Sequence, residues 1–381
     1  MLYFDMCATT PPHEEVITAV TDVMKRHYGN PSSIHRIGLE AEQLLRKARE
    51  VVSGSLKCRP DEIVFTSGGT ESNNLAIKGA ARSYRNRGKH IITSSVEHAS
   101  VYDCCKQLEE EGYRITYLPV DETGAVRVED VRSALSDDTI LVSIMHVNNE
   151  VGRIQPVQQI GELIKAYPGI LFHVDAIQSI GKLYVSPKEL GADLLSVSAH
   201  KVHGPKGAGL LYVRKGVSLT PQLVGGGQES GLRSGTENVP LIVGMAKAVR
   251  MAVQDQQANA DKLYGLRKRL EDKLAGMPDL IMNGSPAMNE MAPQLVHFSF
   301  PGMKSEVVVH ALEQHGICIS TRSACASGEE LPSRVLLAMG CGKERAVSGL
   351  RVSFSAAHTA EDIDFFGECL KQVVEKLRIL K

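Results

Sequence analysis

The chain has 381 residues, which is enough for one large domain and a smaller one. Its 43 basic and 44 acidic side chains give a formal net charge of −1, which excludes a bulk electrostatic attraction to nucleic acid or to an anionic membrane. Since there is neither a long apolar run nor a basic, apolar export signal at the start, we expect a cytoplasmic protein. The eight cysteines include no Cys-x-x-Cys pair, so we expect reduced thiols and no bound metal.

Short apolar segments alternate with amphipathic helical segments through the first two thirds of the chain. This alternation predicts an α/β fold with a mostly parallel sheet and helices on its faces. The strands are expected at residues 2–5, 62–65, 90–94, 114–118, 139–145, 171–174, 194–197 and 209–213. The helices are expected at residues 13–27, 38–56, 128–135, 155–166 and 240–257, with one more running through Ala76 and Ala80.

The last third of the chain predicts a smaller domain of mixed helices and strands. Its strands are expected near residues 295–300, 317–320 and 350–353, and its helices at 258–274, 305–315, 333–339 and 360–380. We therefore expect a large domain at residues 13–257, and a small domain made of residues 1–12 and 258–381.

A glycine-containing turn follows the predicted strand at 62–65. Its residues are Ser67-Gly68-Gly69-Thr70, and a helix begins in or just after it. Glycines let backbone amides approach a ligand, and the free amides of a helix start bind anions. The Gly-x-Gly-x-x-Gly spacing of a dinucleotide site is absent. The turn is therefore either a phosphate site or an ordinary capped helix start.

Polar residues also follow three other predicted strands. His98 comes after the strand at 90–94, where an imidazole could stack on a flat ring or carry a proton, or be an ordinary loop residue. Asn148, after the strand at 139–145, is a candidate polar contact in a cleft. Asp175 and Gln178 lie three residues apart and can face the same cleft. A buried carboxylate needs a partner, which a protonated ring nitrogen would supply; a helix cap is the alternative for Asp175.

The apolar strand at 194–197 ends in Ser198-Ala199-His200-Lys201. Open α/β sheets bind their ligands at the carboxyl edge, so these side chains are expected in a cleft. A lysine there is partly desolvated, which favours the neutral amine, and a neutral amine can form a Schiff base with an aldehyde. A solvated loop lysine is the alternative, and the polar residues after the neighbouring strands argue against it.

Three further features lie later in the chain. A glycine-rich loop at 225–236 ends at Thr236, and loops of this length tend to be functional or to lie at interfaces. Cys325 is surrounded by small and polar residues, with Arg322 close by, which suits a reactive thiol as well as an idle loop thiol. Arg351 interrupts an apolar strand and needs a partner, either a substrate carboxylate or a structural ion pair.

Taken together, these stretches resemble the cysteine desulfurases, the NifS/IscS-like branch of the class V aminotransferases that use pyridoxal 5'-phosphate (PLP). The resemblance runs from Tyr3 to the strand that holds Arg351. It implies the PLP-dependent transferase type I fold, with a mostly parallel seven-stranded sheet in the large domain and a smaller α/β domain. The matching motifs are 29–33 (Gly-Asn-Pro-Ser-Ser), 65–74 (Phe-Thr-Ser-Gly-Gly-Thr-Glu-Ser-Asn-Asn), Glu97-His98, 146–150 (His-Val-Asn-Asn-Glu), 175–178 (Asp-Ala-Ile-Gln), 198–201 (Ser-Ala-His-Lys), 233–236 (Arg-Ser-Gly-Thr) and 323–325 (Ser-Ala-Cys).

The resemblance implies how the cofactor would be held. Lys201 would bind it covalently, Asp175 would pair with the pyridine nitrogen, Gln178 would pair with the phenolic oxygen, and His98 would stack on the ring. Thr236 would reach the phosphate from the second subunit of a homodimer. The other implied phosphate ligands are Gly69, Thr70, Ser198 and His200.

The resemblance also implies the reaction. Asn148 and Arg351 would bind the carboxylate side of L-cysteine, and Cys325 would take its sulfur as a persulfide, leaving L-alanine. The sulfur would pass to an acceptor protein, such as an iron–sulfur scaffold or a sulfurtransferase of tRNA thiolation. A PLP aminotransferase, a selenocysteine lyase and a catalytically idle binding partner remain alternatives; the intact set of Lys201, Asp175, His98 and Cys325 argues against the last.

Overall fold

The computed structural model describes residues 1–321 and 332–379, and within this part seven strands form the main sheet in the order β2-β8-β7-β6-β5-β3-β4. Strand β8 runs antiparallel to both of its neighbours, and the other pairings are parallel, as predicted. The strands are β2 (Ile63–Thr66), β3 (His90–Ser94), β4 (Arg114–Leu118), β5 (Thr139–Met145), β6 (Leu171–Asp175), β7 (Leu194–Ser198) and β8 (Gly209–Val213).

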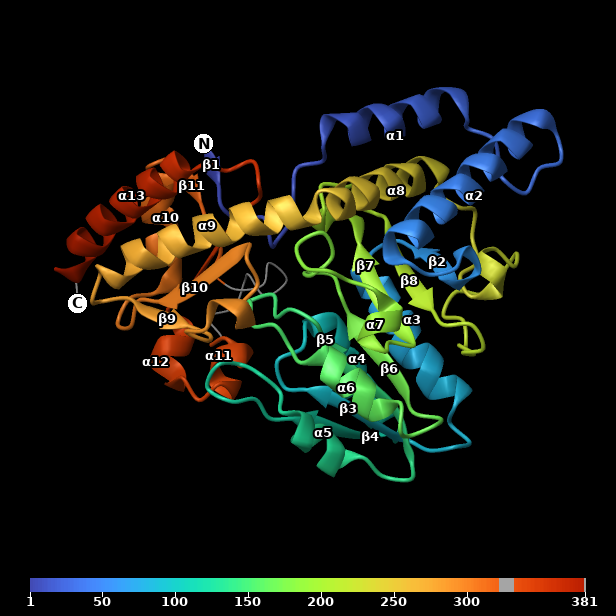
Figure 1. Cartoon of the computed structure of the whole chain (residues 1–381), viewed down its shortest axis with the longest axis horizontal. Helices are drawn as coiled ribbons and strands as arrows, with labels where there is room; N and C mark the ends of the chain where they lie inside the picture. The colour runs from blue at the N-terminus through green and yellow to red at the C-terminus, as the bar shows by residue number, and fades with distance from the viewer. Residues whose placement is uncertain (322–331, 380–381) are drawn as a thin grey trace.

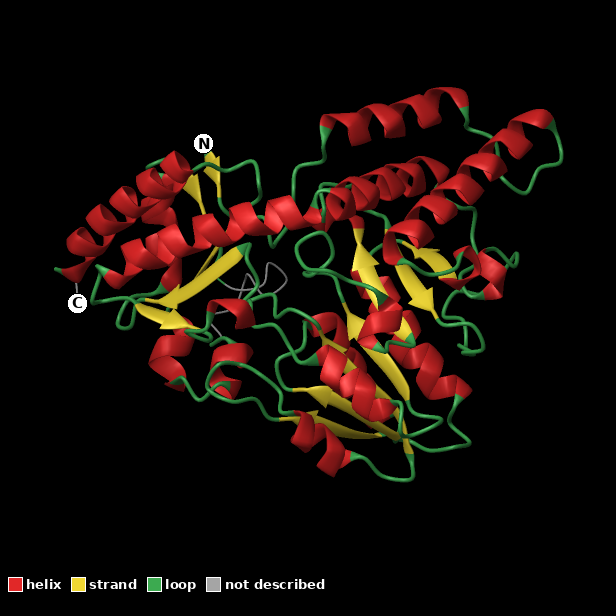
Figure 2. Cartoon of the chain, viewed as in Figure 1, coloured by secondary structure: helices red, strands yellow, loops and turns green. Residues whose placement is uncertain are grey.

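Helices cover both faces of this sheet, which explains why its central strands are almost continuously apolar (Figures 1 and 2). On one face, Leu75 of α3 and Val101 of α4 pack with Leu141 of β5. On the other face, Val52 of α2 and Met245 of α8 pack in a second cluster. The helices of this part are α1 (Glu14–Arg26), α2 (Arg36–Leu56), α3 (Gly69–Ser83), α4 (Ala99–Glu110), α5 (Val128–Ala134), α6 (Val157–Ile164), α7 (Pro187–Leu190) and α8 (Val239–Gln254), with the 3₁₀ turns η1 (Pro60–Glu62), η2 (Ala199–Lys201) and η3 (Glu229–Gly231).

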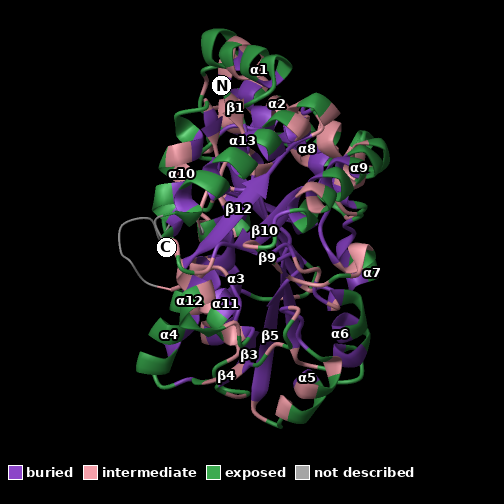
Figure 3. Cartoon of the chain, turned by 90° about the vertical axis from the view of Figure 1, so that its left-hand side faces the viewer, coloured by how far each residue is buried: buried purple, intermediate pink, exposed green. Residues whose placement is uncertain are grey.

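The rest of the chain builds a second core around two small sheets. In its described part, β12 (Gly349–Ser353), β10 (Leu295–Ser299) and β9 (Ile281–Asn283) form an antiparallel sheet, and β1 (Leu2–Tyr3) pairs in parallel with β11 (Ile317–Cys318). The helices here are α9 (Gln256–Ala275), α10 (Ser305–Glu313), α11 (Arg334–Ala338), α12 (Gly342–Val347) and α13 (Ala360–Arg378), with the turn η4 (Met288–Glu290). In both cores the central strands, such as β5 and β10, are buried while the outer faces of the helices are exposed (Figure 3).

The predicted division into residues 13–257 and residues 1–12 with 258–381 stays a prediction. The pairing of β1 with β11 supports it, because it places the first residues of the chain beside the last third. Helix α9 follows α8 after Asp255 and extends from the main sheet toward the second core (Figure 1). Among the described residues, no helix has the length and apolar character needed to cross a bilayer.

Among the α-helices and strands of the described residues, the sequence patterns missed four, of which α4 is the longest. Its buried positions Val101, Cys104 and Leu108 follow the spacing of an amphipathic helix, so the signal was present. The other three, α7, β9 and α12, have four, three and six residues, and elements that short carry little periodic signal.

Candidate active site

A cavity of about 160 Å³ lies at the carboxyl edge of the main sheet. Five strands of the sheet, β2, β3, β5, β6 and β7, deliver residues to it, and the first residues of the chain close one side. The predicted residues that line it are Gly69, Thr70, His98, Asp175, Gln178, Ser198, His200, Lys201 and Arg351. Parallel strands bring segments separated by more than a hundred residues to one edge, which explains this convergence.

Lys201 projects from the 3₁₀ turn η2 that follows β7. Its amine donates hydrogen bonds to the backbone carbonyls of Cys7 at 2.5 Å and Ala8 at 2.8 Å. These two carbonyls belong to the first residues of the chain and hold the amine inside the cavity.

Asp175, at the end of β6, is part of a buried hydrogen-bond network. One carboxylate oxygen accepts from the side-chain amide of Asn73 at 2.8 Å, and the other accepts from the Ile177 amide at 3.0 Å. Asn73 also donates to the hydroxyl of Ser100 at 2.8 Å. Burial raises the pKa of Asp175, although both hydrogen bonds and the neighbouring charges oppose the shift. A protonated ring nitrogen in the cavity would favour the carboxylate form.

His98 is joined to the same network. Its Nδ1 accepts a hydrogen bond from the Ser100 amide at 3.1 Å and lies 2.9 Å from the Ser100 hydroxyl. Burial lowers the pKa of His98, so the neutral ring is favoured. An Nδ1 that accepts leaves the proton of the neutral ring on Nε2.

The end of the cavity beside the start of α3 suits a phosphate. Within the described residues no side chain caps α3, so the first amides of the helix stay available and the ordinary capped start is not what forms. The buried hydroxyl of Ser198 has no hydrogen-bond partner among the described residues. A Cβ on Gly69 would lie 2.2 Å from Cδ1 of Ile177, so this position has no room for a larger residue. Burial and the nearby Lys201 lower the pKa of His200 to about 4, which leaves its ring neutral.

These groups together fit PLP. An amine for the aldehyde, a buried carboxylate for the ring nitrogen and an uncapped helix start with a spare hydroxyl for the phosphate all open into one cavity. Gln178 also lines this cavity, and its amide nitrogen donates to the Cys7 carbonyl at 3.0 Å.

One of the two predicted substrate contacts, Asn148, is placed differently from expectation. The described lining of the cavity includes Asn149 rather than Asn148. Asn148 uses its side-chain oxygen to accept from the amides of Glu150 and Val151 and its nitrogen to donate to the Val96 carbonyl, so it shapes the turn. Its predicted substrate contact stays a prediction without support from this arrangement.

Arg351 lines the cavity but already has partners. Its guanidinium donates to the Asn149 carbonyl at 2.8 Å and forms an ion pair with Asp5 at 2.9 Å. The Nε of Arg351 is buried without a hydrogen-bond partner among the described residues. The structural ion pair is therefore present, and the substrate role stays a prediction.

Thr236 is exposed, and the described lining does not include it. Cys325 lies outside the described residues, as does its neighbour Arg322. Their predicted roles remain predictions from the sequence.

Sequence reasoning missed Asn73, which joins Asp175 to Ser100. A signal existed, because Asn73 lies four residues after Gly69 and so faces the same side of α3. It also missed the carbonyls of Cys7 and Ala8, because a contact made by a backbone group leaves no signal in the sequence.

Glu97, beside His98, is a buried carboxyl that is 1% exposed. One of its oxygens accepts from the Ser94 hydroxyl at 2.6 Å and from the Met145 amide at 3.1 Å. The other oxygen has no partner among the described residues. Burial raises the pKa of Glu97 to about 8, so this side chain is mostly protonated at neutral pH.

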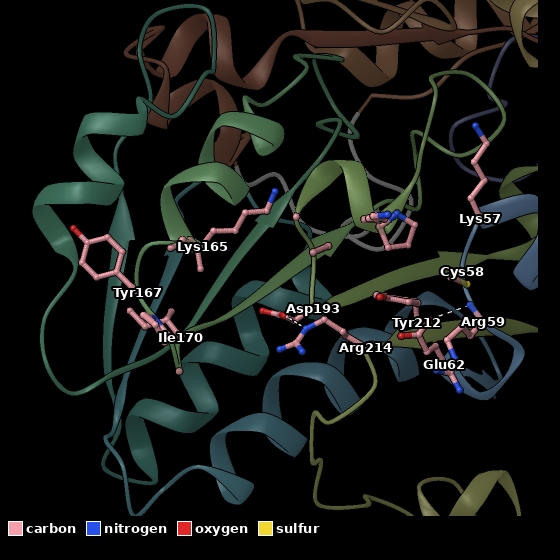
Figure 4. Close-up of a pocket in the computed structure, with 17 residues that line it drawn as sticks. Lys57, Cys58, Arg59, Glu62, Lys165, Tyr167, Ile170, Asp193, Tyr212 and Arg214 are labelled. Carbon is pink, nitrogen blue, oxygen red and sulfur yellow. Dashed lines mark hydrogen bonds and ion pairs between the residues drawn. The ribbon is translucent and has the colours of Figure 1, made fainter.

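A larger and more open cleft, of about 760 Å³, lies at the opposite edge of the sheet (Figure 4). It is lined by residues that come just before β2, β6 and β7 and just after β8. Its charged side chains include the Arg214–Asp193 pair, at 2.5 Å, and its thiol Cys58 has a pKa that burial raises to about 12. A thiol that stays protonated is a poor nucleophile, so the larger cleft lacks a reactive group of this kind. The volume of a cavity therefore does not identify the candidate reactive centre here.

Comparison with known proteins agrees with this geometry. The family described as Aminotransferase class-V matches residues 2–366. The chain is 44% identical over 383 residues to "Cysteine desulfurase IscS" of Dictyoglomus turgidum, covering 100% of this chain and 96% of that protein. It is 46% identical over 367 residues to "NifS/IcsS protein homolog" of Lactobacillus delbrueckii subsp. bulgaricus, covering 96% and 95%. A solved "NIFS-LIKE PROTEIN" superposes with a TM-score of 0.91 at 39% identity, covering 99% of both chains.

The buried Glu97 predicts a pH-dependent stability difference between the wild type and the Glu97→Gln variant. Folding raises the pKa of this carboxyl group, so its contribution to the free energy of unfolding is largest at a pH below the pKa that it has in the unfolded chain. The contribution is lost as the pH rises toward 8, the pKa in the folded protein. Between pH 5.5 and 7.5 the wild type should lose unfolding free energy relative to Glu97→Gln, by up to about 1.4 kcal/mol per pH unit. Urea unfolding at several pH values measures this, with Glu110→Gln, an exposed carboxyl of α4, as the control. Parallel pH profiles for wild type and Glu97→Gln would contradict the prediction.

Proposed function

The chain belongs to the Aminotransferase class-V family, and on that premise we propose that it is a PLP-dependent cysteine desulfurase. It converts L-cysteine to L-alanine and passes the sulfur to an acceptor. The observation that carries the proposal is that Lys201, Asp175 and the uncapped start of α3 open into one cavity. The identity to a named cysteine desulfurase over the full length supports this choice within the family.

The positions of the residues in the cavity support the roles that we propose for them. When bound, PLP supplies an electron sink for the electrons left at Cα of the amino acid. Asp175 holds a proton on the pyridine nitrogen, and Asn73 keeps the carboxylate turned toward the cavity. Ser198 and the start of α3 hold the phosphate, and the Lys201 amine takes the Cα proton of the substrate.

The neutral His98 stacks on the cofactor ring and can move a proton to or from the substrate thiol. The Cys325 thiolate attacks the substrate sulfur, so that a sulfur–sulfur bond forms while the carbon–sulfur bond breaks. This role rests on the position of Cys325 in the sequence motif at 323–325. The persulfide on Cys325 then passes its outer sulfur to an acceptor protein, either an iron–sulfur scaffold or a sulfurtransferase of tRNA thiolation.

We also propose a cytoplasmic location for the protein. The seven cysteines in the described part of the chain are free thiols, which suits a reducing compartment.

Replacement of Lys201 tests the cofactor assignment. The purified wild type should be yellow, and borohydride reduction followed by peptide mapping should find the cofactor on Lys201, because its amine opens into the cavity. Lys201→Ala should lose this label and at least 99% of the activity on L-cysteine. Lys206→Ala, an exposed lysine five residues away, is the control and should keep both. Label on another lysine would refute the assignment.

Replacement of Cys325 tests the sulfur acceptor. Cys325→Ser should bind PLP and L-cysteine like the wild type yet form almost no alanine, because a serine hydroxyl stays protonated at neutral pH and does not attack sulfur. Alanine formation and the visible spectrum of the bound cofactor are measured together. Wild-type turnover by Cys325→Ser would show that Cys325 is not the acceptor and would favour the selenocysteine lyase or aminotransferase alternatives.

Mixing two inactive variants tests a homodimer with shared sites. We propose that Thr236, exposed and outside the cavity of its own chain, reaches the phosphate of the other subunit. Lys201→Ala and Thr236→Ala proteins, unfolded together and refolded, should regain up to about a quarter of the wild-type activity, because half of the dimers are mixed and each has one intact site. No recovery on mixing, or a monomer in analytical ultracentrifugation, would contradict this proposal.

A further inference from the structure

Arg334, from the last third of the chain, contacts residues that come before His98 and a residue that comes after it. We propose that Arg334 is a positioning residue for His98: it fixes the turn between β3 and α4 and so holds the imidazole at the cofactor cavity. The inference rests on the proposed function for the role of His98, whereas the contacts of Arg334 are independent of it.

Arg334, the first residue of α11, uses both ends of its guanidinium on this turn. Nη1 donates to the backbone carbonyl of Ser95, and Nη2 donates to that of Glu97. Its Cζ also lies 3.9 Å from the centre of the Tyr102 ring, over the face of the ring. Since the Tyr102 amide donates to the His98 carbonyl at 3.0 Å, Arg334 contacts the chain before His98 and one helical turn after it.

The remaining contacts around α11 make this attachment rigid. The Ser333 hydroxyl donates to Glu150 at 2.6 Å, and the Ser333 amide donates to the Ala346 carbonyl at 3.0 Å. Val96, from the same turn as the two carbonyls, is fully buried against Val335 and Leu336 of α11. Arg334 therefore acts on a turn that already packs against its own helix.

The chemistry of the contact requires arginine. A guanidinium presents several N–H groups in a fixed plane and can reach two carbonyls at once, whereas a lysine amine is a compact charge on a flexible stem. The two carbonyls that Arg334 satisfies belong to a turn whose Glu97 is buried, where an unpaired carbonyl is costly. Loss of the guanidinium should let the turn relax and displace His98.

Arg334 also contributes to the charge around His98. Burial lowers the pKa of His98 most; Lys201 and Arg334 lower it further, while Asp175 and Asp103 raise it. Removing the charge of Arg334 should therefore raise the pKa of His98, whereas a lysine at 334 should leave it nearly unchanged. Charge and geometry can thus be separated with two variants.

The test compares Arg334→Met and Arg334→Lys with the wild type. The matched control is Arg153→Met, because Arg153 likewise reaches across to a backbone carbonyl, that of Glu290, at 2.8 Å. Three quantities are measured for each protein: kcat and KM for L-cysteine as a function of pH, the melting temperature, and the pKa of the His98 ring in the cofactor-free protein. The last is followed by NMR on ¹³C-labelled histidines, with His98→Gln assigning the signal.

For Arg334→Met we expect a 10- to 100-fold loss of kcat with a smaller change in KM, and a raised His98 pKa in the cofactor-free protein. Arg334→Lys should keep the His98 pKa near the wild-type value but still lose kcat, because one amine cannot hold both carbonyls. Arg153→Met should lower the melting temperature without moving kcat or the His98 pKa. If Arg334→Met does not fold, Arg334→Lys alone tests the inference: a loss of kcat supports it, and a wild-type kcat contradicts it.

The inference is overturned if both Arg334 variants change only the melting temperature, as Arg153→Met is expected to do, while kcat and the His98 signal stay at wild-type values. Failure of the proposed function looks different. In that case the wild type itself would not act on L-cysteine. A changed ¹³C chemical shift of the His98 ring in cofactor-free Arg334→Lys, which keeps the positive charge, would still show that Arg334 positions the ring.

Discussion

The buried carboxylate of Asp175 is the constraint on which the rest of the site depends. It lies at the end of a central strand, is held by Asn73 and the Ile177 amide, and has its pKa raised by burial. A positive partner strongly favours the anionic form of a buried carboxyl group. In PLP enzymes that partner is the ring nitrogen, and keeping it protonated makes the ring an electron sink. The hydrogen-bond network that orients Asp175 also reaches His98 through Ser100, so the positions of these two side chains are coupled.

Residues from the start and from the last third of the chain contribute to this site, although they lie far in the sequence from the strands that form it. Backbone carbonyls of the first residues of the chain accept hydrogen bonds from the Lys201 amine, and Asp5 forms an ion pair with Arg351 of β12. Arg334 donates hydrogen bonds to backbone carbonyls of the turn before His98. The cavity is therefore closed by segments from both ends of the chain, so a change in how the two cores pack would move the lysine's partners and the histidine turn.

The chemical groups that line the two candidate cavities favour the smaller cavity as the proposed reactive centre. The larger cleft at the amino edge of the sheet carries the Arg214–Asp193 ion pair and a thiol that burial keeps protonated. The smaller cavity at the carboxyl edge brings an amine and a buried carboxylate together with an uncapped helix start and the Ser198 hydroxyl, which has no hydrogen-bond partner among the described residues. Reactivity here follows from the kinds of groups that meet in a desolvated place rather than from volume.

The amino-acid sequence alone predicts the strands of the main sheet and the polar residues that follow them, because buried parallel strands are short apolar runs with abrupt polar ends. Those patterns are enough to assign Gly69, His98, Asp175, Ser198 and Lys201 to one edge of the sheet. Only the tertiary structure shows that Asn149 rather than Asn148 faces the cavity, since the Asn148 side chain satisfies backbone groups of its own turn. The partners of Arg351 and Arg334 likewise depend on the tertiary structure. Contacts between residues more than two hundred positions apart leave no periodic signal in the sequence, and every residue has a backbone carbonyl, so the residue type does not mark which one is used.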